Sequence, residues 1–460
     1  MSQPKKIFGT DGVRGTANIE PVTAETALKL GRAAGHVFKN IALQSRGRGR
    51  HKIVLGKDTR LSGYMLENAI SSGILSMGVD VLFIGPLPTP GVAYVTRSLR
   101  ADAGIVITAS HNPYDDNGIK FFRPDGYKLD PNIETQIEQL VFSGEIENIR
   151  PTAAAIGKAV RIDDALGRYI EYAKSSFPRG MTLEGMRIVL DCAHGAAYKS
   201  TPCVLRELGA EIFVYGNQPD GMNINKECGS MFPEQMCQKV WEHHAHIGIS
   251  HDGDGDRVLF CDETGKLIDG DDIMAICGLE MLAEQTLQDQ TLVATVMSNA
   301  GLDAVIKQAG GRVVRTAVGD KNLIDEMLRS GFNFGGEQSG HTIFRDYSTT
   351  GDGLVCALQV LRIMKAKDQP LSRLASCWKR YPQLVSNIRV REKVPFDQLD
   401  GVLQLVSQAE SELAPCGGRV LLRYSGTEPK ARLLIEGSES AVVEKWTLKI
   451  IETIKKQVGT

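Results

Sequence analysis

The sequence predicts an α/β protein with three similar α/β domains, each containing a mixed, largely parallel sheet, followed by a C-terminal α+β domain. A pattern of strand, polar loop, helix, glycine and strand occurs three times, which is typical of βαβ units. The last part of the chain departs from this pattern. At 460 residues the chain is also too long to fold around a single core, and its length favours several domains.

The repeated pattern first occurs at residues 52–86, where KIVLGKDTR precedes a helix-like stretch and GVDVLFIGP follows it. It recurs at 186–217, from MRIVLDCAHGAA to GAEIFVYGN, and at 291–320, from TLVATVMSNAG to GGRVVRTAVGD. Three occurrences predict three related domains. The remainder predicts strands at 387–394, 418–425 and 430–437, a helix ending near residue 413 and a final amphipathic helix, which is an α+β arrangement.

Three stretches suit domain boundaries. Residues 145–160 combine polar residues, Pro151 and an alanine run, residues 258–272 follow an acidic loop, and KAKDQP interrupts the pattern near residue 368. We therefore expect domains at 1–150, 151–257, 258–368 and 369–460.

The composition is that of a soluble globular protein, with 42% hydrophobic and 23% charged residues. A net charge of −2 argues against a nucleic-acid-binding protein. The N-terminus has no apolar signal core, no apolar run reaches the ~20 residues that span a bilayer, and the nine cysteines form no CxxC pair. We expect a cytoplasmic protein that binds neither membranes nor nucleic acid.

The stretch TASHNPYDDNGIKFF, residues 108–122, follows an apolar run that predicts a buried strand at 103–107. Ser110 then lies just beyond the end of a strand, where α/β proteins commonly place their chemistry. A hydroxyl with His111 beside it and the cation Lys120 nearby forms a candidate nucleophile site. An ordinary polar turn explains this stretch equally well when it is taken alone.

The acidic loop DGDGDR, residues 252–257, also follows a predicted strand. Asp252, Asp254 and Asp256 alternate with glycines, and this spacing suits a hard divalent cation such as Mg²⁺. An EF-hand is disfavoured because Arg257 occupies its glycine position and the flanks are strand-like. A solvated acidic turn is an alternative, although three close carboxylates repel one another. If Ser110 carries a phosphate, its oxygens could complete this metal site.

Two further loops suit substrate binding. In GGEQSGH, residues 335–341, Glu337, Ser339 and His341 could recognise sugar hydroxyls, although a plain polar turn is an equal alternative. RYSGTEPKAR, residues 423–432, suits a phosphate cradle, with a surface turn as the alternative. The cradle residues are Arg423, Ser425, Gly426, Thr427 and Arg432.

The motifs GTDGVRG, TASHNP, DGDGDR, GEQSGH and RYSGTEP, in this order, resemble the α-D-phosphohexomutase family over essentially the whole chain. Within that family, Gln338 and the stretches 223–230 and 346–353 are similar to bacterial members that act on glucosamine phosphate. Tyr424 and the pair Lys430-Ala431 depart from the commoner pattern, so the resemblance leaves only fine substrate selectivity open.

The resemblance implies four domains around a central cleft and a phosphoserine at position 110. It implies one Mg²⁺ per chain, held by that phosphate with Asp252, Asp254 and Asp256. Arg14, His111 and Lys120 would line the reacting phosphate. The GEQSGH loop would bind sugar hydroxyls, and the 423–432 loop would hold the phosphate that does not react.

The expected reaction is the conversion of glucosamine 6-phosphate to glucosamine 1-phosphate through glucosamine 1,6-bisphosphate, which makes the protein an isomerase that supplies UDP-N-acetylglucosamine and cell-wall synthesis. The partner is a small hexosamine phosphate, and a homodimer is possible. Three alternatives stay open: the same chemistry on mannose or glucose phosphate, a metal-dependent phosphohydrolase, and a silent sugar-phosphate binding protein.

Overall fold

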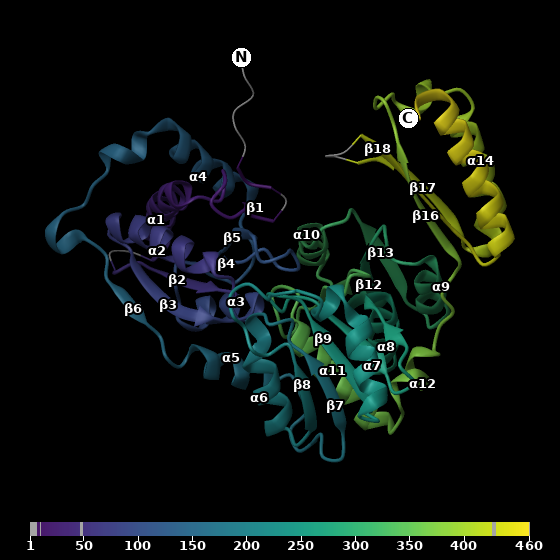
Figure 1. The fold of residues 1–460 in the computed structure, drawn as a ribbon, viewed down its shortest axis with the longest axis horizontal. Helices are drawn as coiled ribbons and strands as arrows, with labels where there is room; N and C mark the ends of the chain where they lie inside the picture. The colour runs from purple at the N-terminus through teal and green to yellow at the C-terminus, as the bar shows by residue number, and fades with distance from the viewer. Residues whose placement is uncertain (1–6, 10, 47–48, 426–428, 460) are drawn as a thin grey trace.

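The structure of the protein is a computed structural model, which describes residues 7–9, 11–46, 49–425 and 429–459. Four sheets follow one another along the chain, and helices cover them (Figure 1). The first three sheets combine strands with α-helices on their faces, and the fourth is a small antiparallel sheet. The predicted fold class is therefore confirmed.

The first sheet has six strands in the order β1-β5-β4-β2-β3-β6. Its core strands β2, β3 and β4 are parallel, whereas β5 runs antiparallel to both β4 and β1. Because side chains alternate along β2, its odd-numbered core residues join the cluster containing α1 and α2, and Val54 joins that of α3 on the other face. The elements of this part are β1 (Val13–Thr16), α1 (Ala24–Arg46), β2 (Lys52–Lys57), α2 (Ser62–Ser76), β3 (Asp80–Pro86), α3 (Thr89–Ser98), β4 (Ala103–Ile107), β5 (Asp116–Phe122), α4 (Pro131–Ser143) and β6 (Ala159–Arg161).

The second sheet has the order β11-β10-β9-β7-β8, and the third has the order β13-β12-β14-β15. The elements of the second part are α5 (Ala165–Lys174), β7 (Arg187–Asp191), α6 (Ser200–Glu207), β8 (Glu211–Tyr215), α7 (Pro233–Glu242), β9 (Ile247–His251), β10 (Val258–Asp262) and β11 (Leu267–Ile268). Those of the third are α8 (Gly270–Ala283), β12 (Thr291–Thr295), α9 (Ala300–Gln308), β13 (Arg312–Thr316), α10 (Asp320–Ser330), β14 (Phe334–Gly336), β15 (Thr342–Phe344), α11 (Gly353–Lys367) and α12 (Leu371–Ala375).

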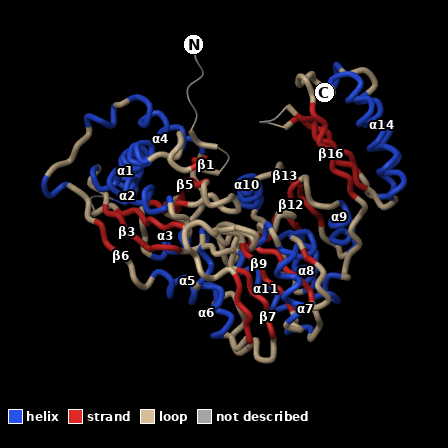
Figure 2. The backbone as a smooth tube through the Cα atoms, in the orientation of Figure 1, coloured by secondary structure: helices blue, strands red, loops and turns tan. Residues whose placement is uncertain are grey.

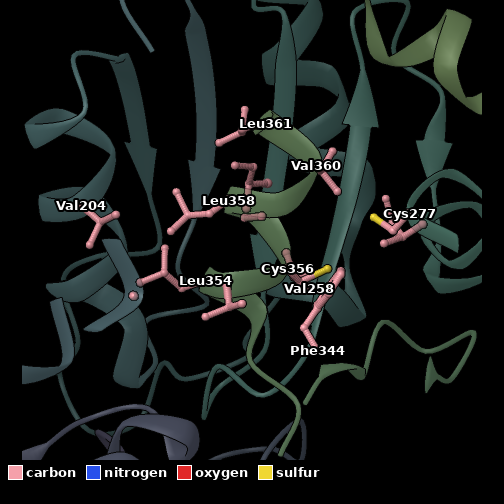
Figure 3. Close-up of a cluster of buried hydrophobic side chains, with 14 of the residues drawn as sticks. Val204, Val258, Cys277, Phe344, Leu354, Cys356, Leu358, Val360 and Leu361 are labelled. Carbon is pink, nitrogen blue, oxygen red and sulfur yellow. The ribbon is translucent and has the colours of Figure 1, made fainter. Parts of the chain in front are cut away.

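One helix joins the second and third sheets into a common core. α11 is buried from Gly353 to Leu361, as expected for a helix whose first turns are almost entirely apolar. In Figure 3 its side chains lie among those of Val204, Val258, Cys277 and Phe344, which come from α6 and β10 of the second part and from α8 and β15 of the third. The helix begins where Asp352 accepts hydrogen bonds from the backbone N–H groups of Leu354 and Val355.

The C-terminal part consists of β16 (Gln383–Arg389), α13 (Val402–Leu413), β17 (Arg419–Tyr424), β18 (Lys430–Glu436) and α14 (Ser440–Val458). It stands apart at the upper right of Figure 2 and follows the third part along the chain. β16 begins four residues before the predicted strand at 387, because residues 383–389 pair in continuous register with β18. Short 3-10 turns complete the secondary structure at Glu145–Asn148, Ala153–Ala155, Ala196–Tyr198, Gly229–Met231, Gln288–Gln290, Phe396–Gln398 and Ala414–Cys416.

The sheets extend beyond the domain boundaries expected from the sequence. β6 pairs with β3, so the first sheet continues past residue 150 to Arg161. β10 pairs with β9 and β11 pairs with β10, so the second sheet continues past residue 257 to Ile268. Because a hydrogen-bonded sheet forms one structural unit, we propose that these two domains end near residues 161 and 268. The third boundary, at 368, stays a prediction. Leu371 and Leu374 of α12, which follow it, still lie in the core that the second and third parts share.

No helix in the described residues combines the length and the apolar character needed to cross a membrane.

Candidate active site

Ser110 lies in the loop between β4 and β5, at the end of a fully buried strand. Its side chain is buried, and its backbone adopts the left-handed region with φ of 51°. The hydroxyl donates a hydrogen bond to Asp252 Oδ2 over 2.6 Å, and His111 Nδ1 lies 3.3 Å from Oγ. Folding therefore brings the serine loop and the acidic loop, 142 residues apart, into direct contact.

Two buried side chains from different domains hold the serine loop in place. Arg60, at the end of β2, donates hydrogen bonds to the carbonyls of Ser110 (2.9 Å), Asn112 (2.8 Å) and Asp116 (3.0 Å), and to that of Pro113. Asn225, from the second domain, donates to the first two of these carbonyls over 2.8 and 2.9 Å. These bonds explain how a non-glycine residue is kept in the left-handed conformation at position 110.

Arg60 is itself anchored, because its Nε donates to Asp58 Oδ2 over 2.8 Å and both side chains are fully buried. Sequence reasoning missed Arg60 and Asn225. A signal for Arg60 was available, since the polar loop after β2 must lie at the same sheet edge as the loop after the parallel strand β4. The sequence marked Asn225 only as part of the stretch 223–230, because its contact with Ser110 depends on how two domains are placed.

The acidic loop lies between β9 and β10 and carries the three predicted carboxylates. Asp252, Asp254 and Asp256 are all buried, and one oxygen of each lies within 4.8 Å of the others. Gly253 permits the close approach of this loop to the serine loop, because a Cβ there would lie 2.6 Å from the Ser110 carbonyl oxygen. The flanking elements are strands, so the structure excludes an EF-hand.

The chemistry of this donor set fits a hard divalent cation. Among the described residues, Asp254 Oδ1 is buried without a hydrogen-bond partner, and Asp256 Oδ1 has only His341 Nδ1 near it, 3.7 Å away. Such burial is costly for carboxylates unless a cation faces them. Burial, together with the charges of the other two carboxylates, raises the pKa of Asp252 well above its usual range. A bound cation would relieve this repulsion.

Lys120 lies on β5 and is buried against the acidic loop. Its Nζ is 3.0 Å from Asp254 Oδ2, 3.0 Å from Asp11 Oδ2 and 3.6 Å from Asp256 Oδ2. Burial by itself lowers the pKa of Lys120, but these carboxylates outweigh it and raise the pKa well above its usual value. Lys120 is therefore charged near pH 7. Arg14 lies 3.7 Å from Asp11 Oδ2.

His111 has the opposite electrostatic environment. Burial and the positive charges of Arg257 and Arg14 lower its pKa to about 4. Its imidazole is therefore neutral near pH 7, with Nδ1 facing the Ser110 hydroxyl. Arg257, the last residue of DGDGDR, was not predicted as a site residue, although its position in the motif placed it at the strand end.

The GEQSGH loop, which connects β14 and β15, approaches the acidic loop through His341. His341 Nδ1 lies 3.7 Å from Asp256 Oδ1, and the imidazole is buried. Glu337 accepts a hydrogen bond from the backbone N–H of Gly319 over 3.0 Å, whereas Ser339 is exposed. All three predicted residues thus lie in one loop, and His341 links that loop to the predicted metal site.

The C-terminal strands that carry the predicted arginines lie apart from these groups. In Figures 1 and 2 the ends of β17 and β18 are separated from α10 and from the first domain. Arg423 and Arg432 are directly opposed partners on these antiparallel strands, and Ser425 is buried nearby. The two arginines therefore lie on the same face of this sheet. The predicted residues Gly426 and Thr427 lie outside the described residues.

Hydrogen bonds connect the C-terminal domain to the third domain. Arg419, on β17, donates to the carbonyls of Val296 and Ser298 over 2.8 Å each. Asn299 binds the backbone of Tyr381 through both its amide nitrogen and its amide oxygen over 2.9 Å each. These contacts hold β17 and the segment before β16 against the third domain.

Comparisons with known proteins match the chain along nearly its whole length. Family models described as phosphoglucomutase/phosphomannomutase match in four parts: alpha/beta/alpha domain I at residues 5–147, domain II at 167–265, domain III at 269–381, and the C-terminal domain at 386–453. Curated relatives named phosphoglucosamine mutase include one from Syntrophotalea carbinolica, 55% identical, which covers 99% of this chain and 98% of its own. Another, from Citrifermentans bemidjiense, is 54% identical and covers 99% of both chains.

Solved structures share the fold at lower identity. A phosphoglucomutase/phosphomannomutase family protein from Burkholderia thailandensis superposes with a TM-score of 0.79 at 23% identity over 99% of both chains. An N-acetylphosphoglucosamine mutase from Aspergillus fumigatus, solved in complex with GlcNAc-6P and magnesium, superposes with a TM-score of 0.64 at 16% identity over 99% of this chain and 96% of its own. The chain therefore belongs to the phosphoglucomutase/phosphomannomutase family of α-D-phosphohexomutases, and it is an enzyme of the isomerase class.

Proposed function

We propose that the protein interconverts glucosamine 6-phosphate and glucosamine 1-phosphate through a phosphorylated Ser110 and a glucosamine 1,6-bisphosphate intermediate. The observation that carries this proposal is the hydrogen bond between Ser110 Oγ and Asp252 in the buried carboxylate loop. The relatives named phosphoglucosamine mutase, 54–55% identical over 99% of the chain, support the choice of substrate.

In the first half-reaction, the phosphoryl group moves from Ser110 Oγ to the free sugar hydroxyl. The bond between phosphorus and Oγ breaks and a bond to the sugar oxygen forms, so the sugar hydroxyl gives up one proton and Ser110 Oγ takes one up. In the second half-reaction, the bisphosphate, turned end for end, returns its other phosphoryl group to Ser110, and the sugar oxygen that this group leaves takes up a proton. Neutral His111 has a ring nitrogen at the serine oxygen and is available to accept the proton that the Ser110 hydroxyl loses in this second step.

One Mg²⁺ per chain, held by Asp252, Asp254, Asp256 and the Ser110 phosphate, would draw charge from the transferring group. The charged residues around it act with it. Lys120 and Arg14 neutralise the reacting phosphate, and positioning with charge neutralisation supplies most of the acceleration in phosphoryl transfer.

The remaining site residues bind the parts of the substrate that do not react. Glu337, Ser339 and His341 contact sugar hydroxyls. The non-reacting phosphate is held by Arg423, Ser425, Gly426, Thr427 and Arg432. Because this cradle lies on a separate domain, the C-terminal domain moves toward the serine loop when substrate binds. We further propose a cytoplasmic enzyme that supplies UDP-N-acetylglucosamine synthesis, with a homodimer as its possible assembly.

Phosphorus NMR tests the proposal directly. The protein is incubated with Mg²⁺, glucosamine 6-phosphate and a trace of glucosamine 1,6-bisphosphate, and a 1-phosphate signal should grow without free phosphate. Ser110→Ala should abolish the signal, whereas Ser175→Ala, at an exposed serine after α5, should not. Release of free phosphate would indicate a phosphohydrolase. If the enzyme converts glucose 6-phosphate or mannose 6-phosphate but not glucosamine 6-phosphate, the substrate assignment changes to that sugar phosphate.

A further inference from the structure

A ring of alternating charges joins the first domain to the third beside the predicted metal site. Lys120 contacts Asp11, and Lys128 contacts both Asp11 and Asp320. Asp320 Oδ2 lies 4.0 Å from His341 Nε2, and His341 in turn approaches Asp256. Lys120, His341 and Asp256 already have a role in the proposed function, but Asp11, Asp320 and Lys128 have none.

Asp320 is the first residue of α10 and lies next to the proposed sugar site. The residue before it, Gly319, donates its backbone N–H to Glu337, which is one of the proposed hydroxyl ligands. His341 Nε2, which faces Asp320, is buried and lacks a hydrogen-bond partner among the described residues. Asp320 is therefore placed between the sugar-binding loop and the acidic loop.

The carboxylates around this site differ in how many positively charged groups each one contacts. Asp252, Asp254 and Asp256 form the metal loop, and Asp11 contacts two lysines. Asp320 contacts one lysine, and both its lysine and its histidine contacts are made through Oδ2. Its side chain is 16% exposed, so a ligand in the site can reach it.

The Lys128 contact shows which chemical group this position accepts. An alkylammonium lies against the Asp320 carboxylate in the structure. Glucosamine phosphate differs from glucose phosphate by an amine at C2 that is protonated near neutral pH, and this amine is also an alkylammonium. A charge-assisted hydrogen bond to a carboxylate favours such a group over the neutral hydroxyl of glucose.

We propose that Asp320 is the residue that selects the amino sugar, by accepting a hydrogen bond from the C2 ammonium of the substrate. This inference rests on the proposed function and adds its specificity determinant. Lys128 acts in the opposite direction, because it competes with the substrate ammonium for the same carboxylate. The expected contribution to selectivity is on the order of tenfold to a hundredfold, which is typical of hydrogen bonds to charged groups.

The test compares kcat/KM for glucosamine 6-phosphate and glucose 6-phosphate, in the full-length Mg²⁺-loaded enzyme. Asp320→Asn keeps the shape and removes the charge, and it should lower the preference for glucosamine at least tenfold. Lys128→Met should raise that preference. Asp320→Glu keeps the charge and should retain more of the preference than Asp320→Asn. Asp325→Asn, an equal charge change at an exposed position of α10, should leave it within about twofold.

N-acetylglucosamine 6-phosphate provides a neutral comparison, because its amide carries no charge. Asp320→Asn should lower kcat/KM for this substrate no more than it lowers kcat/KM for glucose 6-phosphate. An equal loss of kcat/KM on all three substrates would overturn the inference and leave Asp320 a structural residue. If the unaltered enzyme does not convert glucosamine 6-phosphate, the proposed function itself fails, and this inference fails with it.

Discussion

Replacement of Arg60 by methionine tests whether the serine loop is held by a buried charge. Arg60 and Asp58 are both fully buried, and the guanidinium also binds backbone carbonyls of residues 110–116. Arg60→Met leaves the Asp58 carboxylate buried and unpaired, and loss of one partner of a buried ion pair costs about 3–5 kcal/mol. The carbonyls of Ser110 and Asn112 keep the Asn225 amide, so they add less to this cost.

The free energy of unfolding is measured from the first transition in urea, because a four-domain chain does not unfold in a single step. Hydrogen exchange of β4 and β5 amides assigns that transition to the first domain. Arg50→Met is the matched control, since its ion pair with Asp80 is exposed and should contribute less than about 1 kcal/mol.

A second substitution separates the charge from the geometry. Asp58→Asn in the Arg60→Met background removes the unpaired charge and should recover on the order of 2 kcal/mol of stability. Activity should not return, because Ser110 still lacks the hydrogen bonds that position it, and a displacement of about 1 Å can lower turnover roughly 10²-fold. A loss below about 1 kcal/mol in the single variant, or no recovery in the double variant, would refute this account.

Three further predictions concern the metal loop, the phosphate cradle and pH. Asp254→Asn should weaken Mg²⁺ binding at least tenfold in calorimetry, since Asp254 Oδ1 is buried without a partner among the described residues; unchanged affinity would place the metal elsewhere. Arg423→Met should raise KM by about tenfold to a hundredfold, because a charged hydrogen bond to phosphate is lost, whereas Arg389→Met, at an exposed arginine of β16, should not. Burial and the charge of Asp269 raise the pKa of Asp271 to about 7, so the folded state holds a proton that the unfolded state releases near pH 4. The free energy of unfolding of the unaltered protein therefore falls as pH rises from about 4 to 7. The free energy of unfolding of Asp271→Asn, measured against that of the unaltered protein, should increase by roughly 2–3 kcal/mol between pH 5 and pH 8. A difference between the two proteins that does not change with pH would contradict the pKa shift.

Much of the fold could be predicted from the sequence, because its signals are local. The strand at Ala103–Ile107 is a continuous apolar run, and Asp352 lies where a helix start requires a capping acceptor. The extent of the first sheet was harder to predict, because the short strand β6 joins this sheet by pairing with β3, which lies far earlier in the chain. Such pairing leaves little trace in the residues of the short strand itself.

The candidate site divides in the same way. The sequence by itself determined the chemical groups at the strand ends: a serine hydroxyl, three alternating carboxylates, a sugar-binding loop and a pair of arginines. Residue type and spacing define these sets, so the amino-acid sequence alone is enough to recognise them. Only the tertiary structure decided that Ser110 meets Asp252, that Arg60 and Asn225 hold the serine loop, and that Asp320 faces Lys128 across two domains. The physical reason is that these contacts join residues far apart in the chain, and their geometry depends on how whole domains pack.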